Sequence, residues 1–131
     1  SQNQLACADL MKTNVAKVTQ EKKTLECVAI MSRREIDSLV VVDDADHFTG
    51  VLMIETVNER GKAGSSIRDL VTTDFPTVTP DTPAKTAFDI LSSRKTEYVV
   101  VLTEDKKVAG IITKTSMSKA LASVVWGDGN E

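Results

Sequence analysis

The sequence predicts a mixed α/β (α+β) fold of two β-α-β-β-α units, related by a pseudo-twofold axis and packed sheet to sheet. The main observation is an internal repeat: residues 37–53 (DSLVVVDDADHFTGVLM) and 97–113 (EYVVVLTEDKKVAGIIT) follow one pattern, 60 residues apart and without a gap. Such a repeat decides the architecture before any single element does. A second observation is size, because a unit of roughly 50 residues cannot bury a sufficient core alone.

The elements of the first repeat follow from local patterns. Residues 8–11 (ADLM) predict a short helical turn, and residues 15–19 (VAKVT) a brief extended segment. Apolar residues at helical spacing predict a helix over 24–34. Continuous runs of Val, Leu and Ile indicate two strands that are buried on both faces, followed by a last helix; these elements span 38–42, 49–54 and 55–60.

The second repeat has the same order of elements. Pro76 favours an extended Phe75, and Pro83 suits the first turn of a helix over 83–94. Two strands and a final helix follow at 98–102, 108–113 and 115–125. The polar, glycine-containing segment between the repeats is predicted to be a flexible linker. The domain organisation is therefore a first unit, a linker, a second unit and a tail, at 8–60, 61–67, 68–125 and 126–131.

Composition excludes several classes of function. The chain has 131 residues, with 41% hydrophobic and 27% charged residues and a net charge of -3. We therefore expect no general electrostatic attraction to DNA, RNA or an anionic membrane, which leaves room for a small local basic patch. No apolar run is long enough to span a bilayer, and the N-terminus lacks the pattern of a signal peptide. The first residue is Ser1 rather than Met, so we expect a piece of a larger protein.

Catalytic and metal-binding groups are not predicted. The single histidine, His47, lies in a hairpin loop beside Asp44 and Asp46, where a solvated turn is the simpler interpretation. The segment GKAGSS lacks the order of a phosphate-binding loop. Cys27 is expected to be a buried thiol, and a disulfide with Cys7 stays open. We therefore predict no enzyme, no catalytic residue, no metal and no cofactor.

The repeated segments resemble a tandem pair of cystathionine-β-synthase (CBS) domains, also called a Bateman module. The resemblance rests on DLM…VAKVT, DLV…FPTVTPDTP and the two hairpins, and it covers about residues 8–123. The end of the chain, GIITKTSMSKALASVVWGDGNE, resembles the C-terminus of ATP-binding subunits of glycine betaine, carnitine and choline ABC importers. The resemblance implies a cytoplasmic regulatory region at the inner face of the membrane, joined to an ATPase domain and membrane subunits.

The resemblance also bears on the ligand. CBS pairs bind adenosine compounds through a motif with a hydroxyl residue and, three positions later, an Asp that contacts a ribose. The corresponding segments are GVLMIET, with Met53 and Thr56, and GIITKTS, with Thr113 and Ser116. Neither contains the Asp, and a neutral hydroxyl gives a weaker bond than a carboxylate. Ordinary AMP or ATP binding is therefore disfavoured.

Some osmolyte importers resemble receptors for cyclic di-AMP, held where two CBS pairs meet. Transferred by position, the ligand-binding residues would be Ala16, Ile36, Ser38, Tyr98, Ile111, Thr113 and Lys114. The types fit this chemistry. An aromatic ring can stack on adenine, apolar residues can wall the base pocket, Ser38 can bond an adenine edge, and Lys114 can meet a phosphate as a point charge.

Each of these residues also has a structural interpretation. Tyr98, Ile36 and Ile111 could belong to the core, and Lys114 could be an ordinary lysine at a helix start. Arg34 and Arg94 suit helix ends, and Trp126 could cap the core or mediate assembly.

The sequence and the resemblance support three alternative hypotheses for the function. The leading hypothesis is a homodimeric module that binds cyclic di-AMP at its dimer interface and controls osmolyte transport. The alternatives are a sensor of AMP or ATP, and a ligand-free dimerisation or ionic-strength-sensing module.

Overall fold

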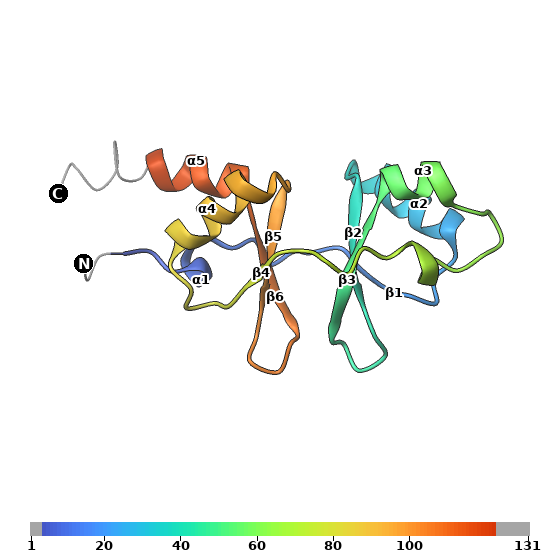
Figure 1. Ribbon diagram of the computed structural model, residues 1–131, viewed down its shortest axis with the longest axis horizontal. Coiled ribbons are helices and arrows are strands. Elements are labelled where there is room, and N and C mark those ends of the chain that lie inside the picture. Colours follow the sequence, from blue (N-terminus) through green and yellow to red (C-terminus); the bar gives the residue numbers. More distant parts are fainter. Residues whose placement is uncertain (1–3, 123–131) are drawn as a thin grey trace. The chain divides into compact units, whose positions relative to one another are not determined.

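The computed structural model describes residues 4–122, so Trp126, the tail and the end of the last predicted helix lie outside the described residues. Five helices, one 3-10 turn and six strands follow one another in this part of the chain (Figure 1). In order they are α1 (Cys7–Leu10), β1 (Lys17–Thr19), α2 (Thr24–Arg34), β2 (Ser38–Val42), β3 (Phe48–Met53), α3 (Ile54–Arg60), η1 (Arg68–Leu70), β4 (Thr77–Val78), α4 (Ala84–Arg94), β5 (Tyr98–Leu102), β6 (Val108–Thr113) and α5 (Lys114–Ala122).

The strands form two three-stranded sheets, which confirms the mixed fold predicted from the repeat. The sheets have the orders β1-β2-β3 and β4-β5-β6. In each, the first strand pairs in parallel and the last pairs antiparallel with the central strand. The predicted strand end at Ile54 was one residue too long, because Ile54 already begins α3.

The repeat is also visible in unusual backbone angles. Glu35 and Lys95, which end α2 and α4, have φ values of 56° and 59°. Asp46 and Lys106, in the turns of the two hairpins, have φ values of 69° and 68°. Non-glycine residues rarely adopt the left-handed region. Two such pairs, each 60 residues apart, show that both halves use the same turns with different side chains.

The compact units cut across the sequence repeats. Residues 15–75 form one unit, whereas residues 4–14 join 76–122 in the other. Lys12 exchanges two backbone hydrogen bonds of 2.9 Å with Ile111 of β6. Thr72 makes the equivalent pair with Val51 of β3, at 2.8 and 2.9 Å. The short segment before each repeat's first strand therefore completes the sheet of the other repeat.

The second half of the segment predicted to be a linker makes defined contacts with the unit of residues 15–75. The backbone N–H and the hydroxyl of Thr24 both donate to the carbonyl of Ser65, at 2.9 Å each. Ile67 is completely buried in the core of its unit. Small polar residues predict a linker from composition, but here their main-chain groups satisfy the start of α2.

Each unit has its own core between the sheet and its helices. Figure 1 shows α2 and α3 along one side of β1-β2-β3, and α4 and α5 along one side of β4-β5-β6. The first core contains Val18, Cys27, Met31, Leu39, Val41, Leu52, Val57, Ile67 and Leu70. The second contains Cys7, Val78, Ala87, Leu91, Val99, Val101 and Ile112. In residues 4–122, no helix is both long enough and apolar enough to cross a membrane.

The two cysteines are free thiols, one in each core. Burial raises the pKa of both Cys7 and Cys27 to about 11. Because the thiolate is the reactive form, we expect a thiol-specific reagent at pH 8 to label neither cysteine until the chain is unfolded with denaturant. Rapid labelling of the folded chain, followed by mass spectrometry, would contradict the buried placement.

The same pKa values predict how stability depends on alkaline pH. A thiol whose pKa is raised on folding stabilises the native state below its unfolded value of 9.0. That contribution is lost as pH rises through about 11. The free energy of unfolding should therefore fall over this window in the parent, and the part due to the thiols should be absent in a Cys7→Ala/Cys27→Ala variant.

Candidate ligand-binding site

Three of the predicted site residues share one face of the β5–β6 hairpin. Tyr98 lies directly opposite Thr113, and Val100 lies opposite Ile111. Opposite residues of an antiparallel pair, and residues two apart on a strand, project from the same face. Val99 and Ile112 project from the other face and pack in the core with the helices. The half-buried Tyr98 ring, Ile111 and Thr113 therefore belong to the face that the helices leave uncovered.

The hydroxyl of Thr113 caps the N-terminus of α5. It accepts a hydrogen bond of 3.2 Å from the N–H of Ser116, and the Ser116 hydroxyl accepts one of 3.1 Å from the N–H of Thr113. The two hydroxyls are 3.2 Å apart. This reciprocal arrangement resembles a capping box. Ser116, at the position where the resemblance to CBS pairs predicts a ribose-binding Asp, is only 3% exposed and takes part in this cap.

Lys114 is the one charged residue of the predicted set. Its side chain is 54% exposed, and its ammonium group lies 3.8 Å from the carboxylate of Glu97, which is 74% exposed. An ion pair this open to water contributes little to stability. The Lys114 ammonium group can therefore leave Glu97 for a stronger anion at small cost.

The other three predicted residues lie in the unit of residues 15–75. Ser38 begins β2 and lies opposite Met53, so both project from the face of this hairpin that corresponds to Tyr98 and Thr113. Ile36 is 38% exposed just after α2. Ala16 is half-buried against the unit's own core, and its carbonyl accepts a hydrogen bond from Val40, which points to a structural part for Ala16.

Two features of the unit that contains β4-β5-β6 were not predicted from the sequence. Thr96, 60 residues after Ile36, has a buried hydroxyl without a hydrogen-bond partner among the described residues. A groove between α4 and α5 is lined by Leu91, Ser92, Lys95, Lys114 and Met117. Thr96 could have been predicted, because it occupies the position in the second repeat that is equivalent to Ile36 in the first. The groove could not, because it depends on how two helices pack.

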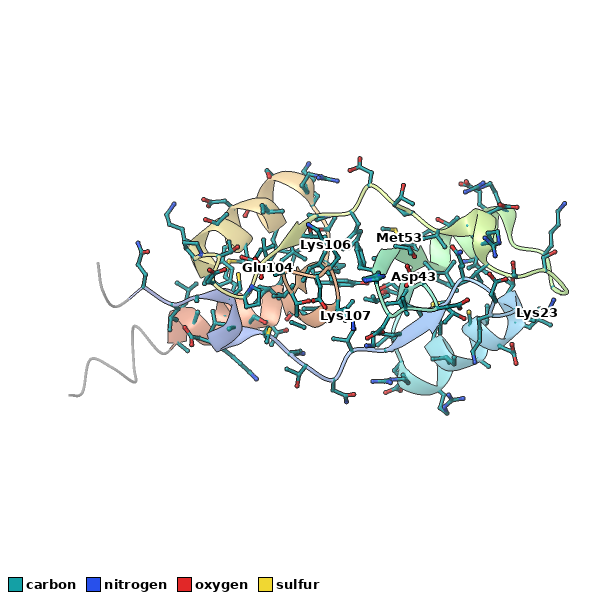
Figure 2. The ribbon with its side chains drawn as sticks, turned by 90° about the horizontal axis from the view of Figure 1, so that it is seen from below. Lys23, Asp43, Met53, Glu104, Lys106 and Lys107 are labelled. Carbon is teal, nitrogen blue, oxygen red and sulfur yellow. The ribbon has the colours of Figure 1, made fainter. Side chains whose placement is uncertain are left out.

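The hairpin loop with the single histidine is built by local hydrogen bonds. Asp43, labelled in Figure 2, accepts bonds from the N–H groups of Ala45 and His47, at 2.9 and 2.8 Å. The bond from His47 is the main reason that the pKa of Asp43 is lowered. In the second hairpin, whose loop carries the labelled Glu104, Lys106 and Lys107, the hydroxyl of Thr103 accepts the equivalent bond from Lys107 at 3.1 Å. Asp43 therefore stabilises a turn.

Two repeats of this order, with matched turns and exchanged leading segments, define a paired α/β module rather than two independent domains. A match to a protein-family model identifies the family of this module. The model of the CBS domain matches residues 7–60 and 67–123, and the chain belongs to the CBS domain family as a tandem pair.

Known proteins that resemble the chain include subunits of osmolyte importers. It is 25% identical over 120 residues to the carnitine transport ATP-binding protein OpuCA of Listeria monocytogenes, a match that covers 92% of this chain and 30% of that protein. The chain thus spans less than a third of this relative. The solved structure of Staphylococcus aureus OpuCA is 26% identical with a TM-score of 0.75, and the match covers 88% of this chain and 98% of that one.

A third similarity concerns the fold. The crystal structure of CBSX2 in complex with AMP has a TM-score of 0.81 and 19% identity to this chain, and the match covers 92% of this chain and 98% of that chain. The AMP belongs to that protein. The likeness supports the CBS-pair fold.

Proposed function

We propose that this CBS pair is the regulatory region of the ATP-binding subunit of an osmolyte ABC importer, and that it binds cyclic di-AMP between two copies to control transport. Its similarity to OpuCA proteins of two species supports the importer context. The bound state would be a homodimer at the cytoplasmic face of the membrane, next to the ATPase domain and the membrane subunits. The CBS pair itself would perform no catalysis.

The observation that carries the choice of ligand is the cap of α5. Ser116 replaces the carboxylate that would bind a ribose diol, and its hydroxyl is engaged with Thr113. Cyclic di-AMP has its 3′ oxygens esterified, so it needs no such carboxylate, and its two phosphates would be repelled by one. Tyr98 and Ile111 then supply a ring and an apolar wall for adenine on the same face.

A sensor of AMP or ATP is the second candidate, favoured by the AMP complex of the similar CBSX2 structure. Calorimetric titration of the chain with cyclic di-AMP, AMP and ATP, in parallel and at one salt concentration, separates the two. The proposal expects heat of binding from cyclic di-AMP and little from the mononucleotides. The reverse order would replace it with the mononucleotide sensor, and no binding to any at millimolar ligand would leave a dimerisation module.

Assembly gives an independent test. An interfacial ligand requires two CBS pairs, and large apolar side chains on two helices, Leu25 of α2 and Leu121 of α5, are 61% and 60% exposed. We expect light scattering at high micromolar concentration to give the mass of a homodimer. A monomer mass with and without cyclic di-AMP would rule out binding at an interface between copies.

A further inference from the structure

A groove lies between the C-terminal end of α4 and the first turns of α5. Its volume is about 450 Å³, and it is lined by Leu91, Ser92, Lys95, Lys114 and Met117. Leu91 is buried and Met117 half-buried, so they form an apolar floor, whereas the two lysines are exposed. A cavity with an apolar floor, a hydroxyl and two ammonium groups suits a ligand that carries a negative group on an apolar body.

The charge of the groove is specific to the second repeat. Sixty residues upstream, Glu35 stands in place of Lys95 and Ile54 in place of Lys114. The backbone at Glu35 and Lys95 is nearly the same, with φ values of 56° and 59°. The turn therefore accepts either charge, and its geometry does not explain why a lysine stands in the second repeat.

Lys95 ends helix α4 through its backbone rather than through its side chain. Its N–H donates to the carbonyl of Leu91 at 3.1 Å and so ends α4. A positive side chain at a helix C-terminus adds a modest favourable interaction with the helix dipole.

The second lysine of the groove, Lys114, lies at the N-terminus of a helix, α5, where the helix dipole favours negative groups instead. Two lysines therefore line one cavity, and the charge of Lys114 is unfavourable to the dipole of the helix that it begins.

We propose that this groove is the phosphate subsite of the regulatory ligand, with Lys95 and Lys114 binding a phosphodiester and Ser92 donating a hydrogen bond to it. This inference rests on the proposed function and adds Lys95 and Ser92 to the residues that recognise the ligand. Glu97, which pairs with Lys114 at 3.8 Å, competes with the incoming phosphate.

The position of the groove fits the base site on the neighbouring hairpin. Tyr98 begins β5 just after the turn that ends α4, and Thr113 ends β6 just before Lys114 begins α5. The groove, on the side of the sheet that the helices cover, and the Tyr98–Thr113 pair, on the other face, therefore lie at the same end of the hairpin. A ligand whose adenine stacks on Tyr98 would have to pass around this end to place its phosphate at Lys114, the residue that the predicted base site and the groove share.

The first experiment tests the groove without a nucleotide. Inorganic pyrophosphate is titrated into the 131-residue chain while backbone amide resonances are followed by NMR. We expect the amides of Ser92, Lys95 and Lys114 to shift in a saturable way. Lys95→Gln, which keeps a polar side chain and removes the charge, should weaken the apparent affinity about three- to fivefold, as expected for an exposed charge contact.

Two further variants separate the groove from general charge effects. Lys85→Gln removes a lysine from the same helix, α4, that is 82% exposed and paired with Asp89, and it should leave pyrophosphate binding unchanged. Glu97→Gln removes the competing carboxylate and should tighten binding, an effect that lost stability would not produce. Absence of saturable shifts at the groove, or equal weakening by Lys85→Gln and Lys95→Gln, would overturn the proposal.

The second experiment uses cyclic di-AMP in the same set of variants. Weaker binding in Lys95→Gln, with a difference that shrinks as salt is added, supports the phosphate subsite. If cyclic di-AMP binds the parent and Lys95→Gln equally well, the subsite is wrong while the proposed function stands. If pyrophosphate occupies the groove and cyclic di-AMP does not bind, the groove is an anion site and the proposed ligand is wrong.

Discussion

Replacing Tyr98 with Ala is expected to weaken the binding of cyclic di-AMP about ten- to a hundredfold. Stacking of a base on an aromatic side chain contributes roughly 1–3 kcal/mol, and each 1.4 kcal/mol changes a dissociation constant about tenfold. Tyr98 is half-buried at the start of β5, on the same face as Ile111 and Thr113. Its ring is thus held by the hairpin, so that little conformational entropy is lost when a base stacks on it.

The matched control for this prediction is Tyr98→Phe, which keeps the ring and removes only the hydroxyl, and which should bind nearly as well as the parent. Lys114→Ala should cost less than Tyr98→Ala and should reduce the salt dependence of binding, because the lysine is exposed and screened. Calorimetry gives the affinities, and a thermal unfolding curve of each variant shows that it is folded. A folded Tyr98→Ala variant that binds as tightly as the parent would exclude stacking on this ring.

Most of the secondary structure could be predicted because each element carries its own local signal. The strands Ser38–Val42 and Tyr98–Leu102 are runs of large apolar residues, and both were predicted to the residue. The exchange of the leading segments could not be predicted in this way. Cys7 and Ile67 are equivalent apolar positions, and a local pattern says that each is buried without saying in which of two similar cores.

The candidate site was predictable only in part, for a related reason. The strand period places Tyr98 and Thr113 on one face, but their direct pairing depends on the register of the hairpin. The engagement of Ser116 with Thr113 depends on where α5 begins. Lys95 carries no sequence signal beyond being a lysine near a helix end. Its proximity to Lys114 across the groove arises from the packing of α4 against α5.

The close approach of the leading segment to β6 predicts the largest effect on stability. A Cβ atom added at Gly110 would lie 2.6 Å from the carbonyl oxygen of Lys12 and 3.0 Å from Sδ of Met11. The first contact is with backbone, which cannot turn away as a side chain can. Gly110→Ala should therefore push residues 4–14 off the sheet and disturb the two hydrogen bonds between Lys12 and Ile111.

We expect Gly110→Ala to lower the free energy of unfolding by about 1–3 kcal/mol, the usual cost of forcing extra atoms into a packed site. Gly64→Ala is the matched control, because a Cβ atom there meets nothing within 4 Å, and it should stay within about 0.5 kcal/mol of the parent. Gly50→Ala tests the other unit, where the added atom would lie 2.3 Å from the carbonyl oxygen of Thr72. Denaturant unfolding of the three variants measures these differences.

Hydrogen exchange identifies the cause of the loss in Gly110→Ala. If the leading segment holds β6 through its backbone, the amides of Lys12 and Ile111, which donate to each other's carbonyls, should lose protection first and together. The equivalent amides of Thr72 and Val51 should keep theirs, because they lie in the other unit. A Gly110→Ala variant as stable as Gly64→Ala, with Lys12 and Ile111 still protected, would mean that residues 4–14 do not complete the sheet of the second repeat. Because Ile111 also lies on the face with Tyr98, release of this segment should weaken cyclic di-AMP binding as well, which ties the exchanged segment to the proposed site.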